Sequence, residues 1–354
     1  MKGKDLISVV IPAYNAEHFI KNGILSIFKQ SYRPIEIIVI NDGSTDHTLD
    51  IIESLENLVP NKEIYMKIIN LKENKGAANA LNVGFKEANG SYICWLSADD
   101  IFINPRKLEK QILTMKKNKT LWSFFEKYYI GESINNAILM GNSYKSKILS
   151  CLSSISTDFL FLFIIYSNPI NGSSLMFHRN CLENYGSFDP LLRNVDADGD
   201  LLMRYALLKI KPAIIKDVGV FYTQHPFQTS KKIKEMIYGC DLTRVRILKL
   251  LEEEEILKEL SKLIALFLLS AIYSGKKIHL AYPFTSEFLI NYMINNSPGL
   301  KRSKLLNKAL IETTQHIESL GLSRDNFYKD VEEKSKSDVF ENFKILLRER
   351  RKKL

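Results

Sequence analysis

The chain has 354 residues, of which 45% are hydrophobic and 25% charged, so it can bury a large core and does not belong to the class of disordered proteins. Its formal net charge of +9 favours an anionic partner. Because no interleaved aromatic and basic pattern is present, we expect a phosphorylated substrate or a phospholipid surface rather than nucleic acid.

The sequence gives no sign of secretion or of a membrane span. The first apolar stretch is too short for a signal peptide and is interrupted by Pro12. The apolar runs at residues 159–166 and 263–273 are shorter than the ~20 residues of a spanning helix. Four scattered cysteines without zinc-ligand spacing are typical of reduced thiols, so we expect a cytoplasmic protein.

In the first hundred residues, short apolar runs alternate with segments of helical periodicity. The run at residues 35–40 is almost wholly apolar, as in a strand buried on both faces of a parallel sheet. The predicted strands are residues 7–11, 35–40, 64–70 and 91–96, and the predicted helices are residues 17–30, 46–55 and 77–88. This alternation predicts an α/β fold with a doubly wound, mostly parallel, Rossmann-like sheet.

Polar clusters follow the first, second and fourth of these strands. They begin at Pro12, at Asn41 and at Ser97. Ligands of a doubly wound sheet bind beyond the carboxyl ends of its strands, and all three clusters occupy that edge. The sequence therefore predicts a ligand site there.

From about residue 231 the chain becomes helical and rich in charge. We expect a catalytic domain at residues 1–230 and an α-helical extension at residues 231–354. The last stretch, residues 343–354, sets Phe343 and Leu347 beside a run of basic residues. One interpretation is an amphipathic helix that docks peripherally on an anionic membrane, at its cytoplasmic face. The other is a helical bundle that packs internally or joins copies into a homo-oligomer.

Phosphate recognition cannot rest on the usual glycine-rich loops, because the sequence has no GxGxxG after its first strand and no GxxxxGK[ST]. A divalent cation on carboxylates is the simplest substitute. Asp99 and Asp100 end a predicted strand and offer the oxygen ligands that Mg2+ and Mn2+ prefer. The alternative is a solvated turn in which Asp100 caps the next helix.

Four motifs, in their order and spacing, resemble the family-2 glycosyltransferases of the GT-A fold. They are SVVIPAYN at residues 8–15, NDGSTD at 41–46, NKGAANALNVG at 74–84 and WLSADD at 95–100, and the resemblance covers residues 5–230. It implies that Asp42 accepts a hydrogen bond from the base and that Lys75 approaches the nucleotide, supported by Asn79 or Asn82. The residues implied to line the base and ribose pocket are Pro12, Ala13, Tyr14 and Asn15.

The same resemblance implies that Asp99 and Asp100 hold Mn2+ or Mg2+ on the diphosphate. Ser97 stands where a third acid is usual, so it falls outside the ligand set. His225 resembles a late histidine that meets the metal or the diphosphate, although Thr223 replaces the arginine that usually precedes it. A purely structural histidine is the alternative.

The resemblance also implies a general base. Transfer to a hydroxyl needs a carboxylate that takes the acceptor's proton, and Asp198 stands where the family has it. Asp200 and Arg204 are implied to be its companions, with Arg204 facing a phosphate of the donor. The alternative is an acidic helix start, which the helix dipole favours by itself. Asn171 and Gly172 resemble the floor of the sugar and acceptor site, or else form a tight turn.

Together these inferences predict an enzyme that transfers a sugar from a nucleoside-diphosphate sugar, expected to be a UDP-sugar, to a hydroxyl of a carbohydrate or lipid-linked acceptor. The resemblance implies inversion, and the Lys-, Ile- and Asn-rich composition favours a bacterial source that assembles surface polysaccharide or glycolipid. Two alternatives stay open. A nucleotidyltransferase needs a Gly- and Arg-rich loop where residues 12–15 read PAYN. A non-catalytic nucleotide-sugar-binding or membrane-adaptor protein needs neither Asp99 and Asp100 nor Asp198.

Overall fold

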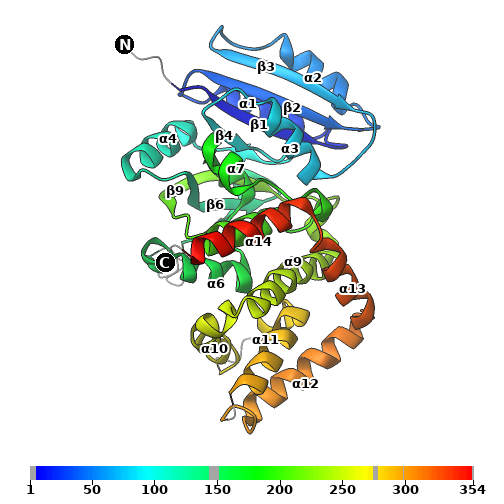
Figure 1. Cartoon of the computed structure of the whole chain (residues 1–354). Coiled ribbons are helices and arrows are strands. Elements are labelled where there is room, and N and C mark those ends of the chain that lie inside the picture. Colours follow the sequence, from blue (N-terminus) through cyan, green and yellow to red (C-terminus); the bar gives the residue numbers. More distant parts are fainter. Residues whose placement is uncertain (1–4, 143–150, 274–277, 298, 353–354) are drawn as a thin grey trace.

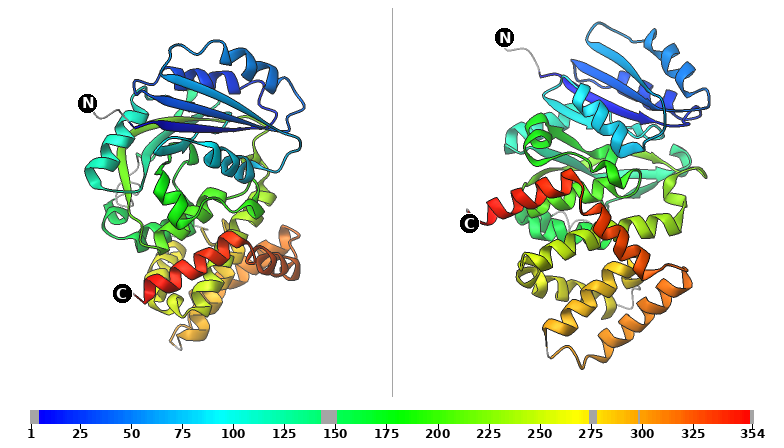
Figure 2. Two further views of the ribbon diagram at one scale, coloured as in Figure 1. Left: turned by 45° about the horizontal axis from the view of Figure 1, so that its top comes forward. Right: turned by 45° about the vertical axis from the view of Figure 1, so that its right-hand side comes forward.

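The computed structural model describes residues 5–142, 151–273, 278–297 and 299–352. Its centre is a nine-stranded sheet in the order β3-β2-β1-β4-β8-β6-β9-β5, with β7 paired to β6. Figure 1 shows this sheet above a group of helices, and in the right-hand view of Figure 2 the N-terminal strands and the yellow and orange helices again lie at opposite ends, with the red C-terminal helix between them. The sheet is mostly parallel, which confirms the predicted α/β fold class.

The first half of the sheet follows the predicted alternation. Its strands β1 to β4 are parallel and span, in chain order, Ile7–Ala13, Ile35–Asp42, Ile64–Leu71 and Tyr92–Trp95. The helices α1 to α3 between them span Ile20–Phe28, Thr48–Glu56 and Ala77–Glu87. Every residue of β2 is buried, as its uninterrupted apolar run requires of a strand covered on both faces.

Alternate residues of β1 face two different layers of helices, because successive side chains of a strand point to opposite faces. Val9 packs in one hydrophobic cluster with Ile20 of α1 and Ile52 of α2. Val10 packs in the other cluster with Leu81 of α3. Helices α1 and α2 therefore cover one face of the sheet and α3 covers the other.

The second half of the sheet mixes parallel and antiparallel pairs, because β5, β7 and β8 each run antiparallel to their neighbours. Strand β8 (Met176–His178) runs antiparallel to both β4 and β6 (Trp122–Gly131), and β6 runs parallel to β9 (Pro212–Thr223). The short strands β5 and β7 span Ile101–Phe102 and Ile138–Met140. The helices of this half, α4, α6, α7 and α8, span Lys107–Asn118, Thr157–Ser167, Arg179–Tyr185 and Ala197–Leu207. Its 3-10 turns η1, η2 and η3 span Ile134–Asn136, Gly172–Ser174 and Pro190–Leu192.

The C-terminal part is helical, as predicted from its periodicity. Helices α9 to α14 span Ile233–Glu253, Ile256–Tyr273, Pro283–Asn296, Lys304–Ser319, Arg324–Lys334 and Asp338–Arg351. The 3-10 turns η4 and η5 span Thr229–Lys231 and Ile278–Leu280. Ile247 of α9 shares a hydrophobic cluster with Phe161 of α6 and Leu202 of α8. The extension is thus fused to the sheet-bearing part through a common core, and the division at residue 230 stays a prediction.

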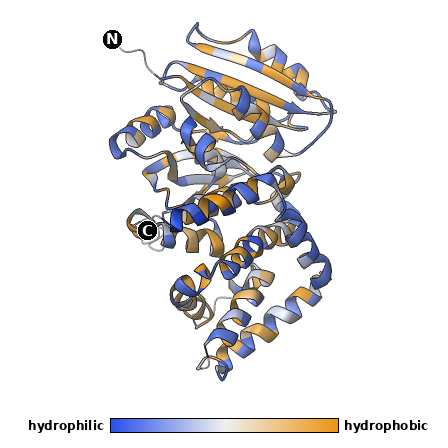
Figure 3. Ribbon diagram, viewed as in Figure 1, coloured by the Kyte–Doolittle hydropathy of each residue, from blue (hydrophilic) through white to orange (hydrophobic). Residues whose placement is uncertain are grey.

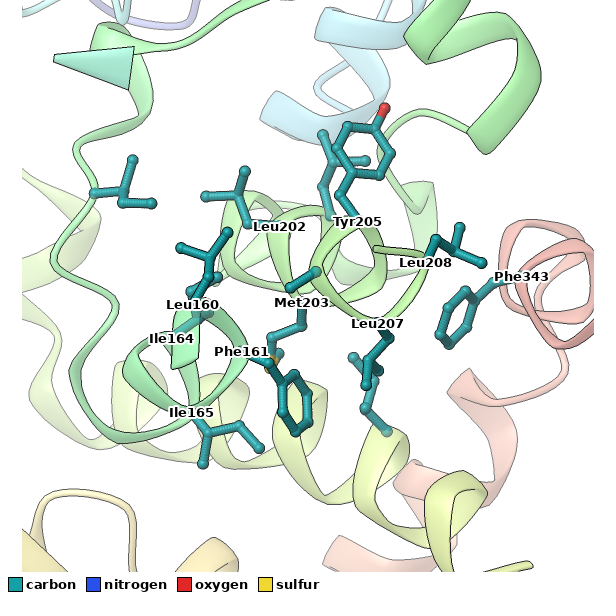
Figure 4. Close-up of a cluster of buried hydrophobic side chains, with 14 of the residues drawn as sticks. Leu160, Phe161, Ile164, Ile165, Leu202, Met203, Tyr205, Leu207, Leu208 and Phe343 are labelled. Carbon is teal, nitrogen blue, oxygen red and sulfur yellow. The ribbon is translucent and has the colours of Figure 1, made fainter. Parts of the chain in front are cut away.

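Helix α14 contains the basic tail, and its packing bears on the two interpretations of that tail. Its apolar residues Phe340, Phe343 and Leu347 are buried in the main core. Figure 4 shows Phe343 directed toward Leu207, the last residue of α8, and Leu208, which follows it, and Figure 3 shows that α14 carries hydrophobic and hydrophilic residues together. The stripe therefore serves internal packing, and peripheral docking of the basic tail on a membrane stays a prediction. The last two residues, 353–354, lie outside the described part.

Within the described residues, no helix combines the length and the hydropathy needed to cross a membrane. The two apolar runs singled out in the sequence lie in α6 and α10. All four cysteines are free thiols, and all except Cys151 are buried.

Candidate active site

A pocket of about 970 Å³ opens at the carboxyl ends of β1, β2 and β4. The last residues of these strands, Ala13, Asp42 and Trp95, all line it. The predicted site residues that line the pocket are Pro12, Ala13, Tyr14, Asn15, Asp42, Asp99, Asp100, Asn171, Gly172, Asp198 and His225. The edge predicted from the polar clusters is therefore the edge at which these residues meet.

Asp42 ties the end of β2 to the loop that precedes α3. Its Oδ1 accepts a hydrogen bond from the backbone N–H of Lys75 at 3.0 Å, and its Oδ2 accepts one from Gly76 at 2.9 Å. Each carboxylate oxygen has a second lone pair, so both bonds leave acceptor capacity for a ligand in the pocket.

Tyr14 and Asn15 follow β1 at the rim of the pocket. Asn15 has a φ of 47°, in the left-handed region that asparagine tolerates, and its Oδ1 accepts a hydrogen bond from the backbone N–H of Thr45 at 2.9 Å. This bond joins the turn after β1 to the turn after β2. Tyr14 is 50% exposed, so its ring is accessible to a ligand at this rim.

The side chain of Lys75 does not reach the pocket in the structure. Its Nζ lies 3.2 Å from Glu73 Oε1, its side chain is largely exposed, and it is not among the residues that line the pocket. Asn82 does not support it, because the Asn82 amide donates to the backbone carbonyl of Phe188 at 2.9 Å and accepts from Ser187 Oγ at 2.8 Å. In the structure Lys75 contributes its backbone N–H to this site, and the approach of its side chain to the nucleotide stays a prediction.

Asp99 and His225 converge at the pocket although they are 126 positions apart in the sequence. Asp99 Oδ2 lies 3.0 Å from His225 Nε2, and the Gln228 amide donates to the same oxygen at 3.3 Å. The Phe19 ring stacks on the imidazole, with the ring centroids 4.2 Å apart. Stacking and hydrogen bonding thus hold both side chains in place.

This pair fits a divalent cation. The Asp99 carboxylate is the type of ligand that Mg2+ and Mn2+ prefer, and the His225 imidazole, 3.0 Å away, offers a nitrogen ligand beside it. The described part of the chain has no cluster of three or more His, Cys, Asp or Glu side chains arranged for a metal. A cation that also binds substrate phosphates and water needs only one or two protein carboxylates, so two ligands suffice for this kind of site.

Asp100 lies next to this pair but is almost completely buried. Its Oδ2 accepts a hydrogen bond from Ser173 Oγ at 2.6 Å, and its Oδ1 accepts one from the backbone N–H of Thr223 at 3.3 Å. Burial, and then the negative charge of Asp99, raise the pKa of Asp100 well above its ordinary value. Asp100 thus connects β4, η2 and β9, and its role as a metal ligand stays a prediction.

Asp198 lies in the first turn of α8, against Gly172. A Cβ atom on Gly172 would stand 3.2 Å from Asp198 Oδ2 and 2.6 Å from the Trp95 ring, so glycine alone leaves room for this approach. Burial, and then the negative charge of Asp196, raise the pKa of Asp198 to about 6. A carboxylate with this pKa is ionised at pH 7 yet binds a proton more readily than an ordinary aspartate, which suits a general base.

Arg204 is fully buried, and it does not line the pocket. Its Nε donates to Asp200 Oδ2 at 2.8 Å, and Arg246 of α9 donates both to the other oxygen of Asp200 and to Asp189. Burial alone would raise the pKa of Asp200, but the charges of Arg246 and Arg204 outweigh it and lower that pKa. The structure therefore corrects the expectation that Arg204 faces a phosphate: it neutralises a buried carboxylate in the helix of Asp198.

Several pocket residues were not anticipated from the sequence. Met236 and Cys240 of α9 and Tyr282, just before α11, reach the pocket from the extension. Arg193, in the loop before α8, also lines it. The motifs carry no signal for the first three, because the resemblance ends near residue 230. The sequence offered one signal for Arg193, namely that it is a basic residue five positions before Asp198.

Comparison with known proteins identifies relatives of the chain. The profile of the Glycosyl transferase family 2 matches residues 8–169. An uncharacterized glycosyltransferase of Rickettsia prowazekii is 30% identical over 269 residues, which cover 73% of each chain. The chain spans about half the length of other curated relatives, namely 43% and 54% of two glycosyltransferases of Haemophilus influenzae and 40% of one of Rickettsia conorii.

Two solved structures share the fold. The S. aureus TarS 1-349 complex with UDP-GlcNAc has a TM-score of 0.50 and 18% identity, covering 98% of this chain and 92% of that one. The mannosyltransferase PcManGT from Pyrobaculum calidifontis, in complex with GDP-Man and Mn2+, has a TM-score of 0.55 and 15% identity, covering 89% and 86%. At these identities the likeness concerns the fold, which is the GT-A fold of glycosyltransferases.

Proposed function

The chain belongs to glycosyltransferase family 2, and we propose that it transfers a sugar, with inversion, from a nucleoside-diphosphate sugar to a hydroxyl of a carbohydrate or lipid-linked acceptor. A UDP-sugar is the donor we propose first. The cytoplasm is the proposed compartment, and the assembly of surface polysaccharide or glycolipid is the proposed setting, as the family resemblance implies.

One observation carries the proposal. Asp42, the Asp99–His225 pair and Asp198 all line a single pocket, although they come from four separate segments of the chain. The three sites serve three needs of the reaction: an acceptor for hydrogen bonds from the nucleotide, ligands for a cation on the diphosphate, and a base for the acceptor hydroxyl. A non-catalytic binding protein needs the first of these but not the last.

Each residue has a distinct task in the proposed reaction. Tyr14 and Asp42 orient the nucleotide at the ends of β1 and β2. A divalent cation, Mn2+ or Mg2+, would be held by Asp99 and His225 and would supply positive charge to the departing diphosphate. Asp198 takes the proton of the acceptor hydroxyl as that oxygen attacks the sugar.

The structural neighbours support the class of donor. TarS 1-349 binds UDP-GlcNAc, and PcManGT binds GDP-Man and Mn2+. Both ligands are nucleoside-diphosphate sugars, and they differ in base and in sugar. A donor of this class is therefore proposed for the present chain, with the choice between uracil and guanine left to experiment.

Calorimetric titration of UDP and GDP into the full chain tests this proposal. We expect one of the two nucleotides to bind in the presence of Mn2+, and binding to weaken strongly in EDTA. His225→Gln should weaken the Mn2+-dependent part of the binding, whereas His316→Gln, on α12 outside the pocket, provides a matched control. Failure of both nucleotides to bind the wild-type chain would refute the proposed donor site.

A further inference from the structure

One wall of the pocket comes from a part of the chain that the family profile does not match. Met236, Cys240 and Tyr282 line the pocket, and all three lie in the helical extension, beyond residue 169 at which the match ends. We call these three residues the extension wall. The residues predicted to bind the nucleotide lie at the ends of β1 and β2. The extension wall is therefore a candidate for contact with the other substrate.

Arg244 of α9 joins the extension wall to the helix of Asp198. Its guanidinium is fully buried and lies 4.1 Å from the centroid of the Tyr282 ring. Its Nη1 donates to Asp196, two positions before Asp198. Because breaking a buried ion pair is costly, this link is rigid. Arg244 thus links Tyr282 to Asp196, the residue that precedes the helix of Asp198.

Two side-chain acceptors without donors lie in the same region. Arg244 Nη2 and the backbone N–H of Asn168 both donate to the carbonyl of Ile164, at 3.0 and 3.2 Å, so Asn168 lies next to Arg244. Asn171 directly precedes the glycine that Asp198 approaches. The Oδ1 atoms of Asn168 and Asn171 are buried and accept no hydrogen bond from any described residue, and both residues line the pocket.

Buried acceptors of this kind indicate a ligand that brings hydroxyl donors. The aromatic ring of Tyr282 indicates, in addition, a ligand with an apolar face. A sugar ring has both properties, because its C–H groups can pack on an aromatic ring while the hydroxyls at its edge donate to amide oxygens. A lipid chain would pack on Tyr282 but would leave both amide oxygens without a donor.

We propose that the extension wall binds the acceptor, that the acceptor presents a sugar ring there, and that Tyr282 contacts the apolar face of this ring. This inference rests on the proposed function, because it assigns the pocket residues at the ends of β1 and β2 to the donor. Arg244 is a positioning residue, which holds Tyr282 and the segment of Asp198 in register. Tyr282 of the extension, together with Asn168 and Asn171, would therefore select the acceptor, while the residues at the ends of β1 and β2 bind the donor.

The test measures binding of methyl glycosides of glucose, galactose, mannose and N-acetylglucosamine to the full chain by saturation-transfer NMR, with and without UDP and Mn2+. Wild-type protein should bind at least one glycoside. Tyr282→Ala should weaken that binding roughly tenfold through the loss of an aromatic contact, while Tyr282→Phe retains it. Asn168→Ala should weaken it as well. Tyr292→Ala, on α11 outside the pocket lining, is the matched control and should bind as the wild type does.

The inference is overturned if no glycoside binds the wild-type chain, or if Tyr282→Ala and Asn168→Ala both bind as tightly as the wild type. Should Tyr282→Ala fail to fold, as circular dichroism would show, Asn168→Ala decides the question alone. Glycoside binding that persists when the wild-type chain binds no nucleotide would contradict the proposed donor site instead, and would support the extension wall as a sugar site.

Discussion

Replacement of Asp198 by asparagine should lower the rate of transfer and, above pH 6, raise the stability of the fold. The substitution keeps the shape of the side chain but removes its capacity to accept a proton. Since general-base catalysis contributes roughly 10²–10⁴-fold, we expect kcat for transfer to fall by about that factor. Nucleotide binding should change little, because Asp198 lies against Gly172 rather than at the turns after β1 and β2.

The pKa of Asp198 sets the expected pH dependence. Burial and the charge of Asp196 raise this pKa from 3.8 to about 6. The base must be ionised, so kcat/KM should fall about tenfold for each pH unit below about 6. Between pH 4 and pH 6 the native protein holds a proton that the unfolded chain has released, so the stability of the wild type decreases as pH rises through this window.

The magnitude follows from the size of the pKa shift. A rise of about two pKa units corresponds to at most about 3 kcal/mol, less where water still reaches the carboxylate. Asp198→Asn lacks this cost, so the variant should match the wild type near pH 4 and exceed its stability above pH 6. Urea denaturation at both pH values, beside a pH profile of kcat/KM, provides the measurements. A variant that is less stable than the wild type at pH 7, or an acid limb that is absent near pH 6, would refute this reasoning.

Three further substitutions have defined outcomes. Gly172→Ala should lower kcat/KM in steady-state assays, because its Cβ would stand 2.6 Å from the Trp95 ring. Arg246→Ala removes the arginine that pairs with Asp189 and one of the two that pair with Asp200, so urea denaturation should show a loss of about 3–5 kcal/mol, whereas the exposed Arg348→Ala should lose far less. Lys107→Met should be more stable than the wild type at pH 7, because burial lowers the pKa of Lys107 to about 8. This gain should shrink in thermal melts as pH rises from 8 to 10.5, where the unfolded lysine also loses its proton.

The first half of the fold was predictable because local pattern and tertiary environment agree there. The apolar run of β2 is explained by burial on both faces, and β3 and α3 end within one residue of their predicted limits. The predicted helix at residues 17–30 was too long, because Ala16 and Glu17 donate hydrogen bonds to Thr48 and Asp46 instead of entering the helix. Such contacts across 30 positions have no local signature.

The site residues that follow strand ends could be predicted from the sequence. The residues whose positions depend on tertiary packing could not. The motifs placed Asp42 and Asp99 at one edge, the resemblance added Asp198 as the base, and all three line the pocket. They could not reveal that Arg204 is turned inward, since an arginine four positions after Asp200 can serve either a phosphate or an internal ion pair. Tyr282 could not be found at all, because its approach depends on the folding of the extension over α8.

The packing partner of the basic tail could not be predicted from the sequence either. The spacing of Phe343 and Leu347 is typical of any amphipathic helix, whether its apolar side meets a bilayer or a protein core. In the structure that side packs on α8, and Arg348 and Arg351 pair with Glu254 and Glu259 near the start of α10. Periodicity identified the helix, but its partner was a property of the whole fold.

Turnover of nucleotide sugars tests the central claim most directly. The full chain is incubated with UDP- and GDP-linked hexoses and N-acetylhexosamines in Mn2+ or Mg2+, and the released nucleoside diphosphate is measured. We predict release from at least one donor, loss of that release in excess EDTA, and its recovery when the metal is restored. Release that continues unchanged in EDTA would contradict the role given to Asp99 and His225. No release from any donor would contradict the claim that this chain transfers sugars from nucleotide donors.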